Sequence, residues 1–312
     1  MTSAEAANVI AARQPPAPGS LNLDHVAHFV PDSDAASLAL RQLGFTLTPF
    51  SPQSHRLQPN GPLVPAGTGN RCVMFEAGYV EFLTPTAITP VADQLRAAIQ
   101  RYVGVHLIAF GTSTPEVDHA RLCEQGFEPL TPVSLQRPIG TEGGEDIARF
   151  TVVRVPPGTM AEGRIQYCQH HTPDLVWQKR WLDHENGAKA LAAVLLCVED
   201  PPAAARRFSR FSGLPFTAAH GAHHIETARG TLTFVEAAAF ERTLGVMPPA
   251  LPWIAGYALD TADLAQTREY LVARAKIIAA PALSDRVLIE LPQSLGGVIA
   301  FQEPGRPALR FN

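Results

Sequence analysis

Cysteine is scarce in this sequence: the 312 residues include four, and no two of them stand in C-x-x-C spacing. The lack of that spacing excludes zinc ribbons and thioredoxin-like redox motifs. Three of the four lie within apolar stretches, which favours reduced, buried thiols and a cytoplasmic location. The four are Cys72, Cys123, Cys168 and Cys197.

Basic clusters, long apolar runs and sharp catalytic motifs are missing as well. The net charge is −4 and no Lys/Arg cluster occurs, so the sequence predicts no nucleic-acid partner. No apolar run approaches the length of a membrane span, and residues 1–20 do not read as a signal peptide. We expect residues 1–20 to form a flexible tail or a short helical arm. The expected partner is a small-molecule substrate. The oligomeric state is left open, a homodimer included.

What the sequence does contain is one pattern of elements that repeats: a strand, a helix and three further strands. Asp32 or Ser33 can cap the first helix, and Gly44 can end it. In the second repeat, the polar and glycine-rich residues 137–147 predict a loop. The predicted fold class is α+β, built from four βαβββ modules. Their opening strands are expected at 23–30, 105–110, 193–198 and 254–259.

Four modules imply two domains of two modules each. We expect a first domain at 21–172, a linker at 173–190 and a second domain at 191–312. The linker reads PDLVWQKRWLDHENGAKA and departs from the strand pattern.

Two histidines occupy matching places in the opening strands of the first two modules. His25 and His106 both begin an H-x-x-x-F run, in which alternate side chains share one face of a strand. They are 81 positions apart, as are the turn residues Asp32 and Ser113. His28 lies on the opposite face of its strand and has no histidine counterpart. The repeat therefore singles out His25 and His106.

The closing strands of the same modules add a carboxylate and an amide. Glu81 stands between apolar neighbours in a strand, and its register partner is Gln166. A buried charge costs several kcal/mol unless it is paired or bound to a metal. His25, His106, Glu81 and Gln166 together would suit a divalent transition metal, and two histidines with one carboxylate also suit Fe(II).

Structural roles for the same residues stay open. The histidines can be hydrogen-bonded core residues, and Glu81 can pair with Arg71 or Arg101.

The run LDHVAHFVPD, a helix ending in LGF, and the stretch GTGNRCVMFEAGYVEFLTP resemble the glyoxalase-like branch of the vicinal oxygen chelate superfamily. This superfamily includes glyoxalase I, extradiol dioxygenases, fosfomycin-resistance proteins and bleomycin-binding proteins. The resemblance implies that paired modules curl into a cup open on a metal or ligand site. It covers the first two modules well and the last two by pattern alone.

The resemblance also implies where the ligands come from: the first and last strand of each paired module. His25, Glu81, His106 and Gln166 match those places. Gln166 departs from the more common glutamate, which removes a base from a glyoxalase I mechanism. Glu81 would then act as ligand and base, or His170, on the same strand face as Gln166, would serve as fourth ligand or base.

The last two modules carry no ligand set. The positions that match His25 and Glu81 there are Ala193, Ile254, Thr233 and Ala300. The second domain is therefore expected to be degenerate, with a structural or substrate-shaping role.

The function predicted from these observations is a metalloenzyme that chelates two neighbouring oxygens of a small organic substrate to a divalent metal (Fe, Mn, Zn, Ni or Co). The reaction is of lyase, isomerase or Fe(II) dioxygenase type. The alternative is a non-catalytic small-molecule-binding protein of the same fold.

Overall fold

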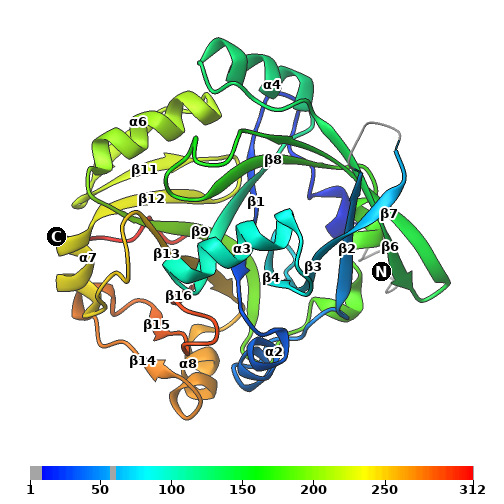
Figure 1. Cartoon of the computed structure of the whole chain (residues 1–312). Coiled ribbons are helices and arrows are strands. Elements are labelled where there is room, and N and C mark those ends of the chain that lie inside the picture. Colours follow the sequence, from blue (N-terminus) through cyan, green and yellow to red (C-terminus); the bar gives the residue numbers. More distant parts are fainter. Residues whose placement is uncertain (1–8, 57–60, 312) are drawn as a thin grey trace.

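The computed structural model describes residues 9–56 and 61–311. The order strand, helix, three strands recurs along the described chain, in agreement with the α+β prediction (Figure 1). The first repeat consists of β1 (Asn22–Phe29), α2 (Ser33–Gln42), β2 (Ser51–Arg56), β3 (Leu63–Met74) and β4 (Tyr79–Pro85). The helix α3 (Pro90–Arg101) leads to the second, formed by β5 (Gly104–Gly111), α4 (Pro115–Glu124), β6 (Val133–Thr141), β7 (Gly144–Arg154) and β8 (Arg164–His170).

Two short helices, α5 (Pro173–Val176) and η1 (Lys179–Trp181), precede the C-terminal half. The third repeat consists of β9 (Ala188–Val198), α6 (Pro201–Ser212), β10 (Phe216–Ala219), β11 (Ala222–Glu226) and β12 (Thr231–Glu236). After α7 (Ala237–Leu244), the fourth consists of β13 (Trp253–Thr261), α8 (Leu264–Val272), β14 (Lys276–Ile277), η2 (Pro281–Leu283), β15 (Val287–Glu290) and β16 (Val298–Gln302).

Each repeat closes in the same way, because its first strand pairs in parallel with its last. The pairs are β1 with β4, β5 with β8, β9 with β12 and β13 with β16. The first strands also pair with one another, β1 with β5 and β9 with β13, both antiparallel. A single bridge between Ile254 and Val105 joins β13 to β5, so the two halves share one continuous sheet.

The helix that follows β1 begins where the sequence predicts. Asp32 is its N-cap, and the Asp32 carboxylate accepts hydrogen bonds from the amides of Asp34 and Ala35. Gly44 follows the helix in the left-handed conformation, at a φ of +83°, which favours glycine. These two residues fix the length of α2 and the direction in which the chain leaves it.

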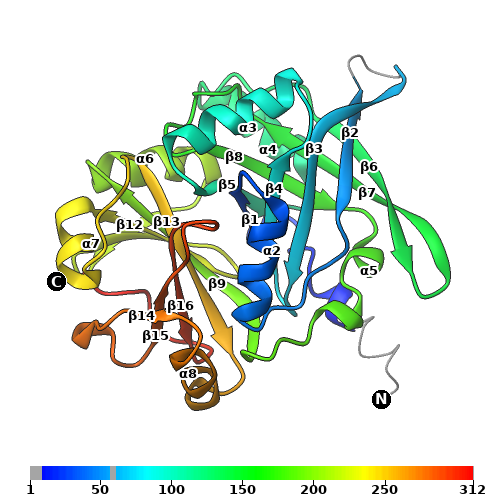
Figure 2. The ribbon, with the colours of Figure 1, turned by 60° about the horizontal axis from the view of Figure 1, so that its bottom comes forward.

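One predicted loop is wrong. Residues 137–147 are not a loop: they form most of a β-hairpin, in which β6 and β7 pair from Val133 with Val152 to Thr141 with Gly144. The hairpin extends from the body on the side away from β14–β16 (Figure 2). Leu135, Phe150 and Val152, nearer the body, are partly or fully buried. The residues from Arg137 to Asp146, at the outer end, are all exposed or half-buried, so this polar, glycine-rich stretch lacks the apolar alternation that marks a half-buried strand.

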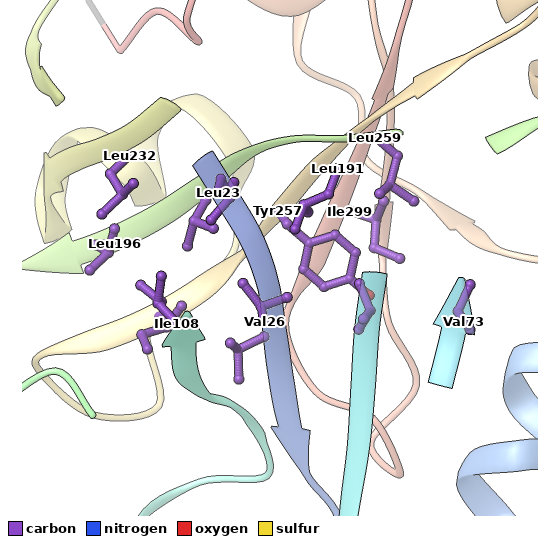
Figure 3. Packing of buried hydrophobic residues seen from close by; sticks show 14 of the residues in the cluster. Leu23, Val26, Val73, Ile108, Leu191, Leu196, Leu232, Tyr257, Leu259 and Ile299 are labelled. Atoms are coloured by element: carbon purple, nitrogen blue, oxygen red, sulfur yellow. The ribbon is translucent and has the colours of Figure 1, made fainter. Parts of the chain in front are cut away.

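The main hydrophobic core is shared by the two halves. Leu23, Val26 and Ile108 of the first half belong to the same buried cluster as Leu196 and Tyr257 of the second. Figure 3 shows these side chains facing one another between the strands. The opposite face of β1 and β5 is thereby left to form the concave wall of a separate site.

The corresponding concave face of the C-terminal half is filled by side chains. Phe240, Trp253 and Phe311 are all at most 2% exposed, and Phe240 stacks on Phe311 with ring centroids 6.1 Å apart. These rings belong to a second buried cluster, on the other side of β9 and β13 from the main core.

Candidate functional site

A cavity of about 230 Å³ lies on the concave face of the N-terminal half, which we call the cup. Three of the predicted site residues line it: His25 from β1, Glu81 from β4 and Gln166 from β8. One wall is apolar and comes from Leu83, Leu95, Leu107, Phe150 and Val152. The cup therefore combines a few polar groups with a wall fit for an organic ligand.

His25 is held in the cup by the residue before it. The pairing of β1 with β5 skips Asp24, because Leu23 lies opposite Phe110 and His25 opposite the adjacent Ala109. This bulge brings the Asp24 carboxylate to its neighbour's ring, where Oδ2 lies 2.7 Å from Nδ1 of His25. The carboxylate accepts the Nδ1 proton, so Nε2 is the ring nitrogen that remains for the cavity.

His170 lies behind this pair and is not one of the residues that line the cavity. Its Nε2 donates a hydrogen bond to the same Asp24 oxygen, at 3.0 Å. Burial alone would lower the pKa of His170, but the Asp24 charge outweighs it and raises the pKa to about 10. Burial alone would likewise raise the pKa of Asp24, and the two histidines hold it well below its usual range. A protonated His170 thus balances the buried carboxylate.

Tyr79 completes the surroundings of this group. Its ring stacks on that of His25, with the centroids 4.4 Å apart and the planes 19° apart. It also makes an edge contact with Trp177, which is fully buried. His25 is therefore fixed by a hydrogen bond on one ring atom and by packing on one face.

The structure does not bring His106 to the cup. Its ring stacks on Tyr102 with centroids 3.9 Å apart, and its Nε2 donates to the Tyr102 carbonyl oxygen at 2.8 Å. Burial lowers the pKa of His106 to about 4, which keeps the ring neutral. In this position His106 is a hydrogen-bonded core residue.

The sequence alignment that matched His106 to His25 is wrong by one residue, because β5 contains a bulge. Ala27 lies opposite Leu107 and His28 opposite Val105, so His106 is the residue that the pairing skips. The strand N-terminal to Ala109 is therefore shifted by one position relative to a regular strand, and the residue that points into the cup beside Arg164 is Leu107.

Three further features place Leu107, rather than His106, at the position of His25. The helix caps that follow, Asp32 and Thr114, are 82 positions apart. In the closing strands, Glu81 lies beside Ala27 as Gln166 lies beside Ala109.

The third feature is a pair of glycines that precede the closing strands. A Cβ on Gly78 would lie 2.8 Å from the carbonyl oxygen of Asp24, and one on Gly163 would lie 2.5 Å from that of His106. Asp24 and His106 are thus equivalent bulge residues in the two modules.

Two side-chain amides donate hydrogen bonds to the Glu81 carboxylate. Its Oε1 accepts a short hydrogen bond from Asn70 and a second from Gln53 at 3.4 Å. The alternative partners, Arg71 and Arg101, instead donate to backbone carbonyl oxygens. Glu81 therefore remains an acceptor at the cavity wall, and within the described residues it has no ion pair.

Three residues of the site escaped the sequence-based prediction. Asp24 was missed because strict alternation puts it on the face opposite His25, and only the bulge reverses that. Arg164 could have been found, because it precedes Gln166 by two positions and so shares its strand face. Arg154 pairs with Gln166 across β7 and β8, a register that the sequence does not show.

The residues of the cup do not fit the four-ligand metal site. The fourth position is an alkyl side chain, Leu107, and three arginines, Arg137, Arg154 and Arg164, line the same cavity. Positive charge beside a site opposes the binding of a divalent cation.

Among the described residues, one group of three metal-ligating side chains has its donor atoms within 4.8 Å of one another: Asp24, His25 and His170. This group has suitable chemistry, but its donor atoms are engaged with one another and only His25 lines the cavity. We therefore derive no chemical step through a metal.

Among the helices that the structure describes, none has the length and apolar character to cross a membrane.

Comparison with known proteins agrees with this architecture. Residues 23–211, more than half of the chain, match the model of the glyoxalase-like domain family. No curated protein matches the sequence.

Solved structures share the fold at low sequence identity. A hypothetical protein from Staphylococcus aureus superposes with a TM-score of 0.61 at 11% identity, covering 91% of this chain and 99% of its own. A mutant 4-hydroxymandelate synthase from Streptomyces coelicolor gives 0.57 at 15% identity, covering 94% and 95%. A fusion of a xylose isomerase-like TIM barrel with 4-hydroxyphenylpyruvate dioxygenase gives 0.58 at 12% identity, covering 95% of this chain and 51% of that one.

The similar structures have the fold of vicinal oxygen chelate dioxygenases, as the sequence resemblance predicted. Since the family model spans both modules of the cup and continues into α6, the chain belongs to the family of glyoxalase-like domain proteins.

Proposed function

We propose that the cup is the active site of an enzyme that moves a proton on a small organic substrate, in a reaction of lyase or isomerase type. The observation that carries this proposal is the orientation of His25. Its Nδ1 is bonded to the buried Asp24, and its other ring nitrogen is left for the cavity. A histidine held in one tautomer by a carboxylate is the usual arrangement of a general base.

Each neighbour of His25 has a part in this reaction. Asp24 keeps the proton on Nδ1, so that Nε2 accepts the proton from substrate, and stabilises the imidazolium that forms. His170 neutralises Asp24 in the resting state. Tyr79 limits rotation of the His25 ring.

The opposite side of the cup binds and orients the substrate. The Gln166 side chain makes no hydrogen bond within the described residues, so its amide is free to donate to a substrate oxygen. Glu81 presents a carboxylate oxygen, held by Asn70, to a substrate hydroxyl. Both act without moving a proton.

A dioxygenase is less well supported by this geometry. Fe(II) oxygenases of the 2-His-1-carboxylate type need two histidines at the open site, and His25 is the one histidine among the described residues that line the cup. A non-catalytic binding protein needs the cavity but gives no reason for the orientation of His25 by Asp24.

Deuterium exchange tests the proposal. Small carbonyl compounds with an acidic C–H bond are incubated with the protein in D₂O, and loss of the C–H signal is followed by NMR. We expect exchange with wild type and a loss of about 100-fold or more in His25→Asn. The control variant is His171→Asn, at the exposed histidine that follows β8, and it should exchange as wild type does. Compounds that bind but never exchange would support a binding protein instead.

A further inference from the structure

Two arginines on neighbouring strands line the cup and have no acidic partner. Arg154 is the last residue of β7 and Arg164 the first of β8, and Arg154 lies opposite Gln166 in their antiparallel pairing. Both guanidinium groups therefore reach the cavity from the same side, beside the free amide of Gln166.

Other partly buried arginines in the chain form ion pairs, unlike these two. Arg121 forms an ion pair with Asp118 at 2.5 Å, and Arg207 forms one with Glu162. In the part of the chain that the structure describes, the side chains of Arg154 and Arg164 form neither an ion pair nor a hydrogen bond, and Nε of Arg154 is buried without a partner. The one specific contact of Arg164 is with the ring of Phe29, at 5.7 Å from the centroid.

Their burial makes this arrangement costly. Burial and, to a smaller extent, the positive charge of Arg154 lower the pKa of Arg164 to about 10, although the nearby charge of Glu81 raises it in part. Burial also lowers the pKa of Arg154. Unpaired buried charges destabilise a fold and persist where a ligand needs them.

The charges at the cavity wall are unbalanced. Among the described residues, three arginines, Arg137, Arg154 and Arg164, line it with one carboxylate residue, Glu81. Asn70 and Gln53 already bind that carboxylate. The surplus of positive charge would be neutralised by an oxyanion from a bound ligand.

We propose that Arg154 and Arg164 bind the anionic group of the substrate, and that this substrate is a small organic acid with an apolar body. The apolar wall of Leu95, Leu107 and Phe150 takes the body. The inference rests on the proposed function in one respect, namely that the same cavity holds the substrate.

The topology sets the length of such an acid. His25, Ala109 and Gln166 lie side by side across β1, β5 and β8. Two strand spacings separate β1 from β8, which is about 10 Å. The acid group would therefore sit several bonds away from the carbon whose proton His25 accepts.

Binding of matched acid and amide pairs tests this inference. The probes are benzoate and benzamide, phenylacetate and phenylacetamide, and hexanoate and hexanamide, measured by calorimetry with wild type, Arg154→Gln, Arg164→Gln and Arg149→Gln. Arg149 is an exposed arginine of the same β-hairpin and serves as the control. We expect at least one acid to bind about tenfold or more tightly than its amide.

In either cup variant that preference should disappear, while Arg149→Gln should keep it. Without ligand, Arg154→Gln and Arg164→Gln should unfold at the same temperature as wild type or higher, because an unpaired charge is removed. The proposal is overturned if no acid binds wild type, if amides bind as tightly as acids, or if both cup variants keep the preference.

The two proposals fail separately. A protein that prefers acids but catalyses no exchange would refute the proton-transfer function alone. Exchange on neutral carbonyl compounds with no preference for acids would refute the anion site alone.

Discussion

At the scale of single residues, Asp24 is the group on which the cup depends. It is 1% exposed and accepts a hydrogen bond from each of two histidines, His25 and His170. A neutral side chain in its place would leave His170 without its counter-charge. It would also no longer hold the proton of His25 on Nδ1, so the ring could adopt the tautomer with the proton on Nε2.

The variant Asp24→Asn should lower the rate of deuterium exchange about as strongly as His25→Asn does, because an amide at this position favours the wrong tautomer of the His25 ring. It should also destabilise the fold by about 3 kcal/mol, because a buried charge pair is broken. Exchange kinetics and urea unfolding measure the two effects. Asp146→Asn, at an exposed position near the start of β7, is the control and should change neither.

A second residue-scale prediction concerns His28, which is fully buried and donates from Nδ1 to the Leu295 carbonyl oxygen. Burial lowers its pKa from an ordinary 6.5 to about 4, in spite of that hydrogen bond. Between these values the unfolded chain binds more protons than the folded one, so stability falls as the pH drops from about 6.5 to about 4, by about 3 kcal/mol from this group.

Urea unfolding at pH 7, 5.5 and 4.5 checks this dependence. His28→Asn keeps a donor for Leu295 and should flatten the acid side of the stability profile, whereas His171→Asn should not. An equally steep decline in His28→Asn would assign the loss to other groups.

At the scale of elements, the bulges of β1 and β5 explain what could and could not be predicted from sequence. The strand and helix order followed from apolar alternation, caps and turns, and so did the positions of His25, Glu81 and Gln166 at the cup. A bulge adds one residue without any signature in a single sequence. The bulge in β1 brings Asp24 into the site, and the bulge in β5 takes His106 out of it.

The β6–β7 hairpin shows a second limit. Hydrophobic alternation reveals a strand only where one face is buried, and no residue from Arg137 to Ile147, at the outer end of the hairpin, is fully buried. The register that places Arg154 beside Gln166 therefore had to come from the structure.

The strand register that places Leu107 at the position of His25 can be tested by metal binding. Leu107 occupies in β5 the position of His25 in β1, so Leu107→His would complete a set with His25, Glu81 and Gln166. We expect this variant to bind Zn²⁺ about tenfold or more tightly than wild type in competition with a chromophoric chelator. Leu107→Ala is the control for lost bulk, and equal affinity in Leu107→His and Leu107→Ala would contradict the assigned register.

At the scale of the whole molecule, the C-terminal half supports the cup from behind. The residues of β1 and β5 that face away from the cavity pack against Leu196 and Tyr257, and the second concave face is filled by its own side chains. The second half thus has a structural role in the fold, with no cavity lining contributed to the site.

Because the core is shared, both halves should unfold together. Ile108→Ala should cost about 3 kcal/mol by opening a cavity between them, and calorimetry should still show one transition. Two transitions, with the upper one unchanged in Ile108→Ala, would mean that the C-terminal half folds independently.

The proton-transfer role of His25 is the central claim, and the rate of deuterium incorporation into a bound small carbonyl acid tests it most directly. His25→Asn should retain the acid but lose the exchange, since Arg154 and Arg164 are untouched. Exchange by His25→Asn at the wild-type rate would contradict the account.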